Sequence, residues 1–380
     1  MLDLSRRSFY SEDHDLFRDQ IRRFFERELT PHLDRWEEQG EIDRDFWRKA
    51  GEAGLLCPNV SPDYGGLGLD FGYNAVIDEE LGYAGSSAGI GLHSDIVAPY
   101  VEAYGSDAIK RHWLPKMISG ETPTAIAMTE PGAGSDLQGI KTTAIADGDD
   151  YIVNGSKTYI TNGQHADLII VAAKTDPAEG AKGISLVVVE SDRPGFQRGR
   201  NLDKIGLHGQ DTSELFFQDV RVPNGNLIGA AGAGFAYMMN QLPQERLQIA
   251  VGAQASAQRA FDEAVRFTKE RKAFGRTVFE FQNTRFTLAG LQAKLQVGWA
   301  HLDWALARHI AGQLTAAEAS AAKLWHTELQ WEVCDAALQL HGGAGYMNEY
   351  LIARLWRDAR VTRIFGGTNE IMKEVIGRAI

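Results

Sequence analysis

The chain has 380 residues, a formal net charge of -12 at pH 7 and a pI of about 5.4. This length exceeds what one hydrophobic core usually serves, so we expect two or three domains. The acidic balance excludes a general electrostatic attraction to nucleic acid or to an anionic membrane, and no apolar run is long enough to insert into a bilayer.

The first third of the chain is expected to be helical. Between residues 12 and 38, apolar residues such as Leu16, Phe17 and Ile21 recur among charges with the spacing of an amphipathic helix. Gly and Pro turns separate the further helical stretches expected at residues 45–53, 72–84 and 107–119. These patterns predict an N-terminal helical domain over residues 1–125.

The sequence pattern changes near Ile126, where short β-rich runs begin. They cover residues 141–146, 151–154, 157–161, 168–173, 184–190 and 215–222. Turn pairs such as Asn154-Gly155 and Asn162-Gly163 break them. No helix of useful length separates these runs, which favours an antiparallel sheet over a Rossmann domain. We therefore predict a middle antiparallel β-domain over residues 126–235.

Long helices return in the last third of the chain. They are expected at about residues 240–272, 284–313 and 316–340, in segments rich in Ala, Leu, Gln and Glu. Thr315 and Glu318 have the spacing of a capping box, so the last two of these helices should form a hairpin. A C-terminal helical domain over residues 236–380 follows, and the whole chain is an α+β multidomain protein.

A glycine-rich loop, Thr129–Asp136, follows the first expected strand. Glycine lets backbone N–H groups approach a phosphate closely, and Thr129 and Ser135 add hydroxyl donors. The loop has the spacing of neither a dinucleotide-binding fingerprint nor a Walker loop, so the bare pattern favours an ordinary turn.

Read together with its flanks, residues 126–128 and 137–140, this loop resembles the flavin-binding signature of the acyl-CoA dehydrogenase family. Further segments resemble the family in the same order along the chain: Asn154–Gly163, Arg271–Gly275, Gln339–Tyr346 and Gly366–Glu370. The likeness spans essentially the whole chain and is greatest to the long-chain branch. It implies a C-terminal four-helix bundle and FAD-dependent conversion of acyl-CoA to trans-2-enoyl-CoA in fatty acid β-oxidation. The electrons would pass to an electron-transfer flavoprotein.

The resemblance also implies the residues of the site. On one chain, the flavin contacts would be Met128, Thr129, Gly134, Ser135, Tyr159, Thr161, Thr368 and Asn369. A second copy of the chain would supply Arg271, Phe274, Gln282, Gln339, Gly342 and Gly343. One FAD would thus use two chains, which implies a homo-oligomer and usually a tetramer. The substrate contacts would be Ser135, Gln244, Arg246, Gly366 and Gly367.

The catalytic base is the point at which this chain departs from the common family pattern. The family often carries its Glu at the position of Gly366, whereas the long-chain and isovaleryl branches carry it in the segment that matches residues 242–247. Glu245 is the candidate, and Pro243 suggests that it lies near the start of a helix. An acidic residue there could merely favour the helix dipole. Because position 366 has no carboxylate, the role of catalytic base is favoured for Glu245 instead.

Several alternatives remain open from the sequence. A flavin oxidase would share every cofactor motif, and Gly366 alone would also suit a flavin- or CoA-binding assembly protein without activity. The ten His residues and the two cysteines, Cys57 and Cys334, lack metal-ligand spacing, so we expect no metal. Residues 1–7 lack the apolar core of a secretion signal. We expect a cytoplasmic protein, or a mitochondrial matrix protein if a transit peptide was removed. The sequence does not set the acyl chain length.

Overall fold

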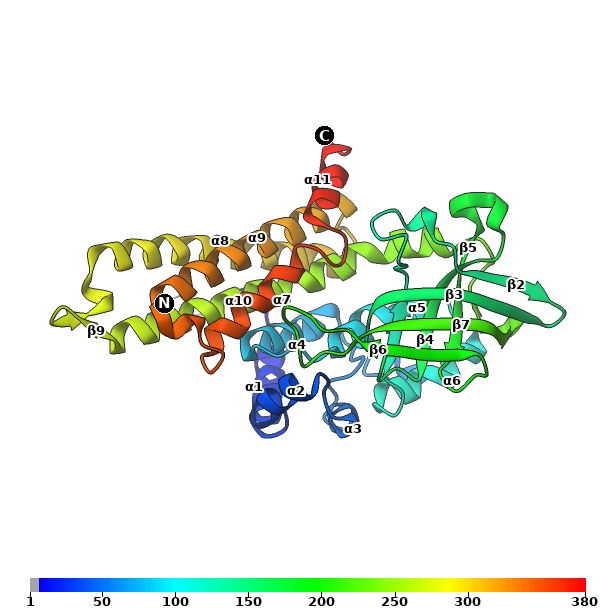
Figure 1. The fold of residues 1–380 in the computed structure, drawn as a ribbon, viewed down its shortest axis with the longest axis horizontal. Helices are drawn as coiled ribbons and strands as arrows, with labels where there is room; N and C mark the ends of the chain where they lie inside the picture. Colours follow the sequence, from blue (N-terminus) through cyan, green and yellow to red (C-terminus); the bar gives the residue numbers. More distant parts are fainter. Residues whose placement is uncertain (1–6) are drawn as a thin grey trace.

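The computed structural model describes residues 7–380, so the expectation for the first six residues lies outside it. The predicted order of helices, sheet and helices is confirmed (Figure 1). The long C-terminal helices run side by side from the sheet to the opposite end of the molecule, and the N-terminal helices pack along one side of them. Among the described residues, no helix is long and apolar enough to cross a membrane.

The N-terminal region contains six α-helices in the described chain. They are α1 (Glu12–Glu28), α2 (Leu33–Gln39), α3 (Arg44–Glu52), α4 (Phe71–Ala84), α5 (Ala98–Tyr104) and α6 (Asp107–Ile118). The single helix expected over residues 12–38 is wrong, because a 3-10 turn, Thr30–His32, separates α1 from α2. Pro31 in this turn has no N–H to donate to the preceding helical turn. A π-helical turn, Leu92–Val97, leads into α5 and was not predicted.

The middle region forms one twisted sheet. Its strands are β1 (Thr124–Ala127), β2 (Thr143–Asp147), β3 (Asp150–Thr161), β4 (Leu168–Lys174), β5 (Ile184–Glu190), β6 (Phe196–Asn201), β7 (Thr212–Pro223) and β8 (Leu227–Ile228). Their order is β6-β7-β3-β2-β4-β5-β8, with β1 beside β4. The prediction of an antiparallel sheet is wrong for β1, which pairs in parallel with β4. The β2–β3 hairpin lies between them in sequence and makes the connection long enough for this crossover.

The turn predicted at Asn154-Gly155 is also wrong, because β3 runs through it with an irregular register. Gly155 has φ +149°, and a side chain there would begin 2.4 Å from the Thr142 hydroxyl, so glycine permits the close approach of the two segments. A second shift in register occurs between Lys157 and Ile160. It turns Tyr159 out of the ladder.

The C-terminal region is built on three long helices, α7 (Gly234–Glu270), α8 (Gln282–Ile310) and α9 (Ala316–His341). They are joined by a short hairpin, β9 (Lys272–Ala273) with β10 (Arg276–Thr277), and followed by α10 (Leu351–Thr362) and α11 (Asn369–Gly377). The α8–α9 hairpin and its cap are confirmed, because Thr315 accepts the Glu318 N–H at 3.2 Å. The expectation that Pro243 starts a helix is wrong, since α7 begins nine residues earlier.

Helix α7 connects the three regions and therefore positions the site. It packs on α4 and on the π-helical turn at one side and on α9 and α8 at the other. Small residues such as Ala250 and Ala253 on its buried face permit this close packing. The first strand and α7 begin within two residues of the predicted domain boundaries, while the division into 1–125, 126–235 and 236–380 stays a prediction.

Candidate active site

Glu245 lies in the interior of the molecule, on the fourth turn of α7. Its side chain is only 6% exposed, and the Tyr100 hydroxyl of α5 donates a hydrogen bond to its Oε1 at 2.9 Å. Burial raises the pKa of Glu245 to about 7, although the Tyr100 hydrogen bond and the positive charge of Arg246 act to lower it. A carboxyl group with this pKa can accept a proton at neutral pH and release it again.

Arg246, the next residue, points to another side of the helix. Its Nη1 donates to the Ser320 hydroxyl of α9 at 3.0 Å, and its Nε has no hydrogen-bond partner within residues 7–380. The guanidinium is 5% exposed, and burial lowers the pKa of Arg246. A buried cation with a free donor is suited to an anionic or carbonyl group of a ligand.

The turn formed by Gly366 and Gly367 faces the same side of α7 as Glu245. Both glycines have left-handed backbone, with φ +61° and +89°. A side chain at Gly366 would begin 2.3 Å from Cδ1 of Ile249, which lies one helical turn after Glu245. Residues four apart on a helix share a face, so the Gly366 turn and the Glu245 carboxyl border the same space. Within residues 7–380, the Gly366 N–H has no internal acceptor.

Lys323 of α9 holds this turn in place and was missed by the sequence analysis. Its fully buried ammonium donates to the Gly367 carbonyl at 2.8 Å and to Oδ1 of Asn369 at 3.0 Å. Asn369 in turn donates to Thr327 at 3.0 Å. Burial, with a contribution from Arg246, lowers the pKa of Lys323 to about 8. The only sequence signal is one lysine within an alanine-rich stretch of helix.

The glycine-rich loop after β1 is fixed by a second buried lysine, also missed. Lys157 of β3 donates to the Met128 carbonyl at 2.9 Å and to Oε1 of Glu130 at 2.8 Å. The Thr158 N–H donates to the Thr129 carbonyl at 3.0 Å. In contrast, no atom lies within 4 Å of where a side chain on Gly134 would begin. The loop is therefore held in place by β3 on one side and open at Gly134 on the other, as a ligand-binding loop requires.

Tyr159 shows a conformation that fits a planar ligand. It has left-handed backbone with φ +60°, which is uncommon for an aromatic residue, and its side chain is 69% exposed. A ring presented in this way offers an apolar face to an aromatic ligand such as a flavin. Met128, Thr129 and Thr161 are partly buried beside it on β3 and the anchored loop. These residues fit the cofactor that the resemblance implies.

The structure does not bring the remaining predicted flavin contacts to this place. Arg271, Phe274, Gln282, Gln339, Gly342 and Gly343 are exposed. The β9–β10 hairpin, which follows Arg271, lies at the end of the helical bundle away from the sheet (Figure 1). Phe267 of α7 stacks on His341 of α9 at 4.3 Å and keeps these helix ends together. Phe274 is 95% exposed with φ +53°.

The predicted contacts Gln244, Thr368 and Asn369 already have partners inside the chain. Gln244 donates to the Asp95 carbonyl at 2.7 Å and approaches Nε2 of His309 at 3.0 Å. Thr368 caps α11 by accepting the Ile371 N–H at 3.3 Å. Direct contact of these three residues with a ligand stays a prediction, whereas their hydrogen bonds within the chain hold the neighbouring segments in place.

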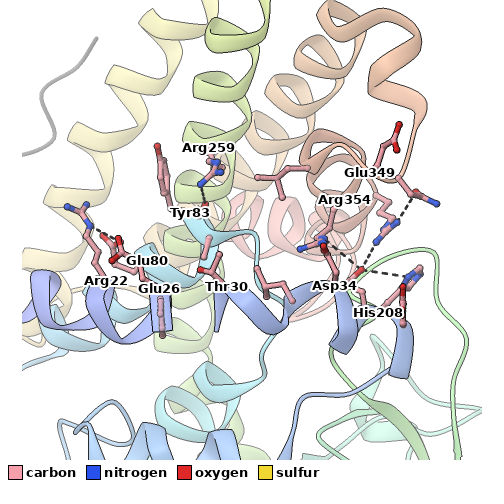
Figure 2. Close-up of a pocket in the computed structure, with 18 residues that line it drawn as sticks. Arg22, Glu26, Thr30, Asp34, Glu80, Tyr83, His208, Arg259, Glu349 and Arg354 are labelled. Carbon is pink, nitrogen blue, oxygen red and sulfur yellow. Dashed lines mark hydrogen bonds and ion pairs between the residues drawn. The ribbon is translucent and has the colours of Figure 1, made fainter. Parts of the chain in front are cut away.

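A separate cavity of about 870 Å³ lies between α1, α2, α4, α7 and α10 (Figure 2). It contains none of the predicted site residues. Its arginines are paired with acidic groups, for instance Arg22 with Glu80 and Arg354 with Asp34. Within residues 7–380, this cavity therefore offers no unpaired arginine to an anionic ligand. In the described part of the chain, no group of three or more His, Cys, Asp or Glu side chains could hold a metal.

Comparisons with known proteins show the family to which the chain belongs. Family models match three successive parts of the chain: the acyl-CoA dehydrogenase N-terminal domain over residues 11–121, the middle domain over 125–220 and the C-terminal domain over 232–380. The long-chain specific mitochondrial acyl-CoA dehydrogenase of Sus scrofa is 49% identical, and the match covers 100% of this chain and 89% of that protein.

Two solved structures extend the comparison. An acyl-CoA dehydrogenase from Geobacillus kaustophilus is 54% identical, with a TM-score of 0.96 over 98% of this chain and 99% of that one. A glutaryl-CoA dehydrogenase from Mycobacterium smegmatis in complex with FADH2 is 26% identical, with a TM-score of 0.93 over 99% and 96% of the two chains. The second relative carries the reduced form of the cofactor that the exposed Tyr159 and the anchored loop fit.

Proposed function

Because the chain belongs to the acyl-CoA dehydrogenase family, it is an FAD-dependent oxidoreductase of acyl-CoA thioesters, and we propose that Glu245 is its catalytic base. The observation that carries this proposal is a buried carboxyl group, with a pKa raised to about 7, one helical turn before Ile249, the residue that the Gly366 turn approaches. The position that could hold a competing carboxylate is occupied by glycine.

The reaction removes a proton from Cα and a hydride from Cβ of the acyl group. Bound FAD supplies the hydride acceptor. Glu245 takes the Cα proton, and its pKa near neutrality keeps part of the enzyme in the charged form that can do so. The free N–H of Gly366 is suited to donate to the thioester carbonyl and so to stabilise the enolate-like charge. One such donor typically contributes about 3 to 4 kcal/mol.

A second copy of the chain completes the cofactor site in this proposal. Support comes from Arg271 and Phe274, which are exposed at the β9–β10 hairpin. This hairpin lies at the end of the helical bundle away from the sheet to which β3 and Tyr159 belong (Figure 1). A flavin bound at Tyr159 and Thr129 would meet these residues only across a subunit interface. We infer a homo-oligomer, with a tetramer as the expected state and an electron-transfer flavoprotein as the redox partner.

The proposed substrates are long-chain or branched acyl-CoA thioesters. The support is the 49% identity to a long-chain specific relative over the whole of this chain. An anaerobic series of acyl-CoAs from short to long, followed by bleaching of the flavin absorbance, tests this assignment. Fastest bleaching by a short straight chain would contradict it, and rapid peroxide formation in air would indicate an oxidase instead.

The base is tested with Glu245→Gln, which keeps the size of the side chain and removes its basicity. Single-turnover flavin reduction should slow by about 10² to 10⁴ fold, while flavin and acyl-CoA still bind. Glu263→Gln, on the same helix but outside the site, is the matched control and should keep the parental rate. Parental reduction by Glu245→Gln would contradict the assignment.

Gly366→Glu placed in the Glu245→Gln background probes whether the two positions reach the same proton. The new side chain would start 2.3 Å from Ile249 and would sit on left-handed backbone, so recovery should be small. Adding Ile249→Ala removes the clash with the new side chain and should increase the recovered activity.

A further inference from the structure

Within residues 7–380, Glu245 has one hydrogen bond from a side chain outside its own helix, and that donor takes no part in the removal of the proton or the hydride. Tyr100 is fully buried, and its hydroxyl lies 2.9 Å from Oε1 of Glu245. Burial and the nearby carboxylate raise the pKa of Tyr100 well above its ordinary value, so the phenol keeps its proton. It is therefore a permanent hydrogen-bond donor to the base.

We propose that Tyr100 is the positioning residue of the base: it holds Oε1 of Glu245, leaves Oε2 for the substrate proton and stabilises the charged carboxylate. This inference rests on the proposed function, because it presumes that Glu245 is the base. A carboxylate that accepts a hydrogen bond favours its ionised form, and an anchored oxygen leaves one rotamer in place of several. The base is then ready before the substrate arrives.

The surrounding contacts hold this part of α7 against α4 and the π-helical turn that leads into α5. Gln244 donates to the Asp95 carbonyl at 2.7 Å, and Gln248 donates to Oδ1 of Asp78 at 3.1 Å. These contacts flank Glu245 on α7 and reach α4 and the π-helical turn that leads into α5. Pro243 lies just before them and cannot donate a helical hydrogen bond, so this turn of α7 depends more on its neighbours. The Tyr100–Glu245 distance is thereby fixed from both sides.

The charged and titratable groups around the pair are few in the described chain. Arg246 on α7 lowers the pKa of Glu245, and Tyr104 on α5 acts on Tyr100. From α9, Lys323 interacts with Arg246. Asp78 and Asp95, on α4 and the π-helical turn, form a buried acid pair whose pKa values are both raised, so at least one of them is neutral. Tyr100 is the one group among these that contacts the carboxyl of Glu245 through a hydrogen bond.

The test is an infrared titration of the Glu245 carboxyl in the FAD-loaded enzyme, which does not depend on turnover. The difference between parent and Glu245→Gln assigns the band. In Tyr100→Phe, the titration midpoint should rise by about one pH unit, because a hydrogen bond to the charged form is lost. Tyr104→Phe is the matched control, since it removes a hydroxyl one turn along α5, and its midpoint should stay at the parental value.

A fluorinated tyrosine incorporated at position 100 keeps the shape of the side chain and makes its hydroxyl a stronger donor. The midpoint should then fall, which a merely structural role of the ring would not produce. This second probe also serves if Tyr100→Phe does not fold. An unchanged midpoint in both Tyr100 variants, or an equal shift in Tyr104→Phe, would overturn the inference. Parental flavin reduction by Glu245→Gln would instead overturn the proposed function, so the two failures are distinguishable.

Discussion

The two parts of the proposed cofactor site differ in how the single chain supports them. Around Glu245, the polar groups are buried and bound within the chain: Tyr100 holds the carboxylate, Lys323 holds the Gly366 turn and Lys157 holds the glycine-rich loop. Around β9, Arg271 and Phe274 are exposed. Folding of one chain completes the first part, whereas we propose that a ligand and another chain complete the second.

The two parts should also differ in how substitutions affect the stability of the protein. Burying a charged group is unfavourable unless hydrogen bonds and an opposite charge compensate for lost hydration, so Lys157, Lys323 and Glu245 make the catalytic part sensitive to substitution. The exposed part carries no such penalty. We therefore expect changes in the first part to alter both stability and activity, and changes in the second to alter assembly and cofactor retention alone.

The largest effect on stability is expected from Lys157→Met. This change leaves Glu130 without its buried cation and the Met128 carbonyl without a donor. Breaking such a pair typically lowers the free energy of unfolding by about 3 to 5 kcal/mol. Thermal unfolding measures this loss of stability, and a flavin-release assay measures cofactor retention. Both the unfolding temperature and the fraction of flavin retained should fall. Lys141→Met, an exposed lysine near the same loop, should remain close to the parent, and equal losses in the two variants would contradict the account.

The pH dependence of stability should reveal the buried Glu245. Its pKa is raised from an ordinary 4.5 to about 7, so between these values the folded state binds more protons than the unfolded state. The free energy of unfolding of the parent therefore falls as pH rises through this window. Glu245→Gln does not titrate, and its stability relative to the parent should increase by about 3 kcal/mol from pH 4.5 to pH 7.

The control for this measurement titrates in the opposite direction. Hydrogen bonding and charge pairing with Arg266 and Arg259 lower the pKa of Glu263 despite its partial burial, so Glu263 stabilises the folded state above its unfolded pKa. Glu263→Gln should lose stability relative to the parent as pH rises. Parallel slopes for the two variants would contradict the assigned environments.

The smallest effect on folding is expected from Arg271→Ala. Arg271 is exposed at the end of α7, and exposed substitutions usually change stability by less than about 0.5 kcal/mol. Sedimentation and flavin release on dilution should nevertheless show weaker assembly and weaker flavin retention. Lys269→Ala, two residues earlier on the same helix, is the control. Full flavin retention in Arg271→Ala would count against a shared cofactor site.

Much of the fold and of the candidate site could be predicted from the sequence. The features that were not predicted have a common cause. Long periodic helices and the glycine-rich loop are local patterns, so they could be located from the residues, and family resemblance pointed to Glu245. The parallel pairing of β1 with β4 depends on contacts between segments far apart in sequence, which no local pattern records. Tyr100, Lys157 and Lys323 are single polar residues whose importance arises from burial, and burial becomes visible only in the fold.

The most direct test of the central claim is hydrogen exchange at Cα, because it isolates proton removal from hydride transfer. A 3-thia acyl-CoA has Cα hydrogens but no hydride to give at the β position, so its exchange in deuterated water reports the base alone. The parent enzyme should exchange the Cα hydrogen readily, and Glu245→Gln should be slower by about 10² to 10⁴ fold with unchanged ligand binding. Equal exchange rates in the two proteins would show that another group removes the proton.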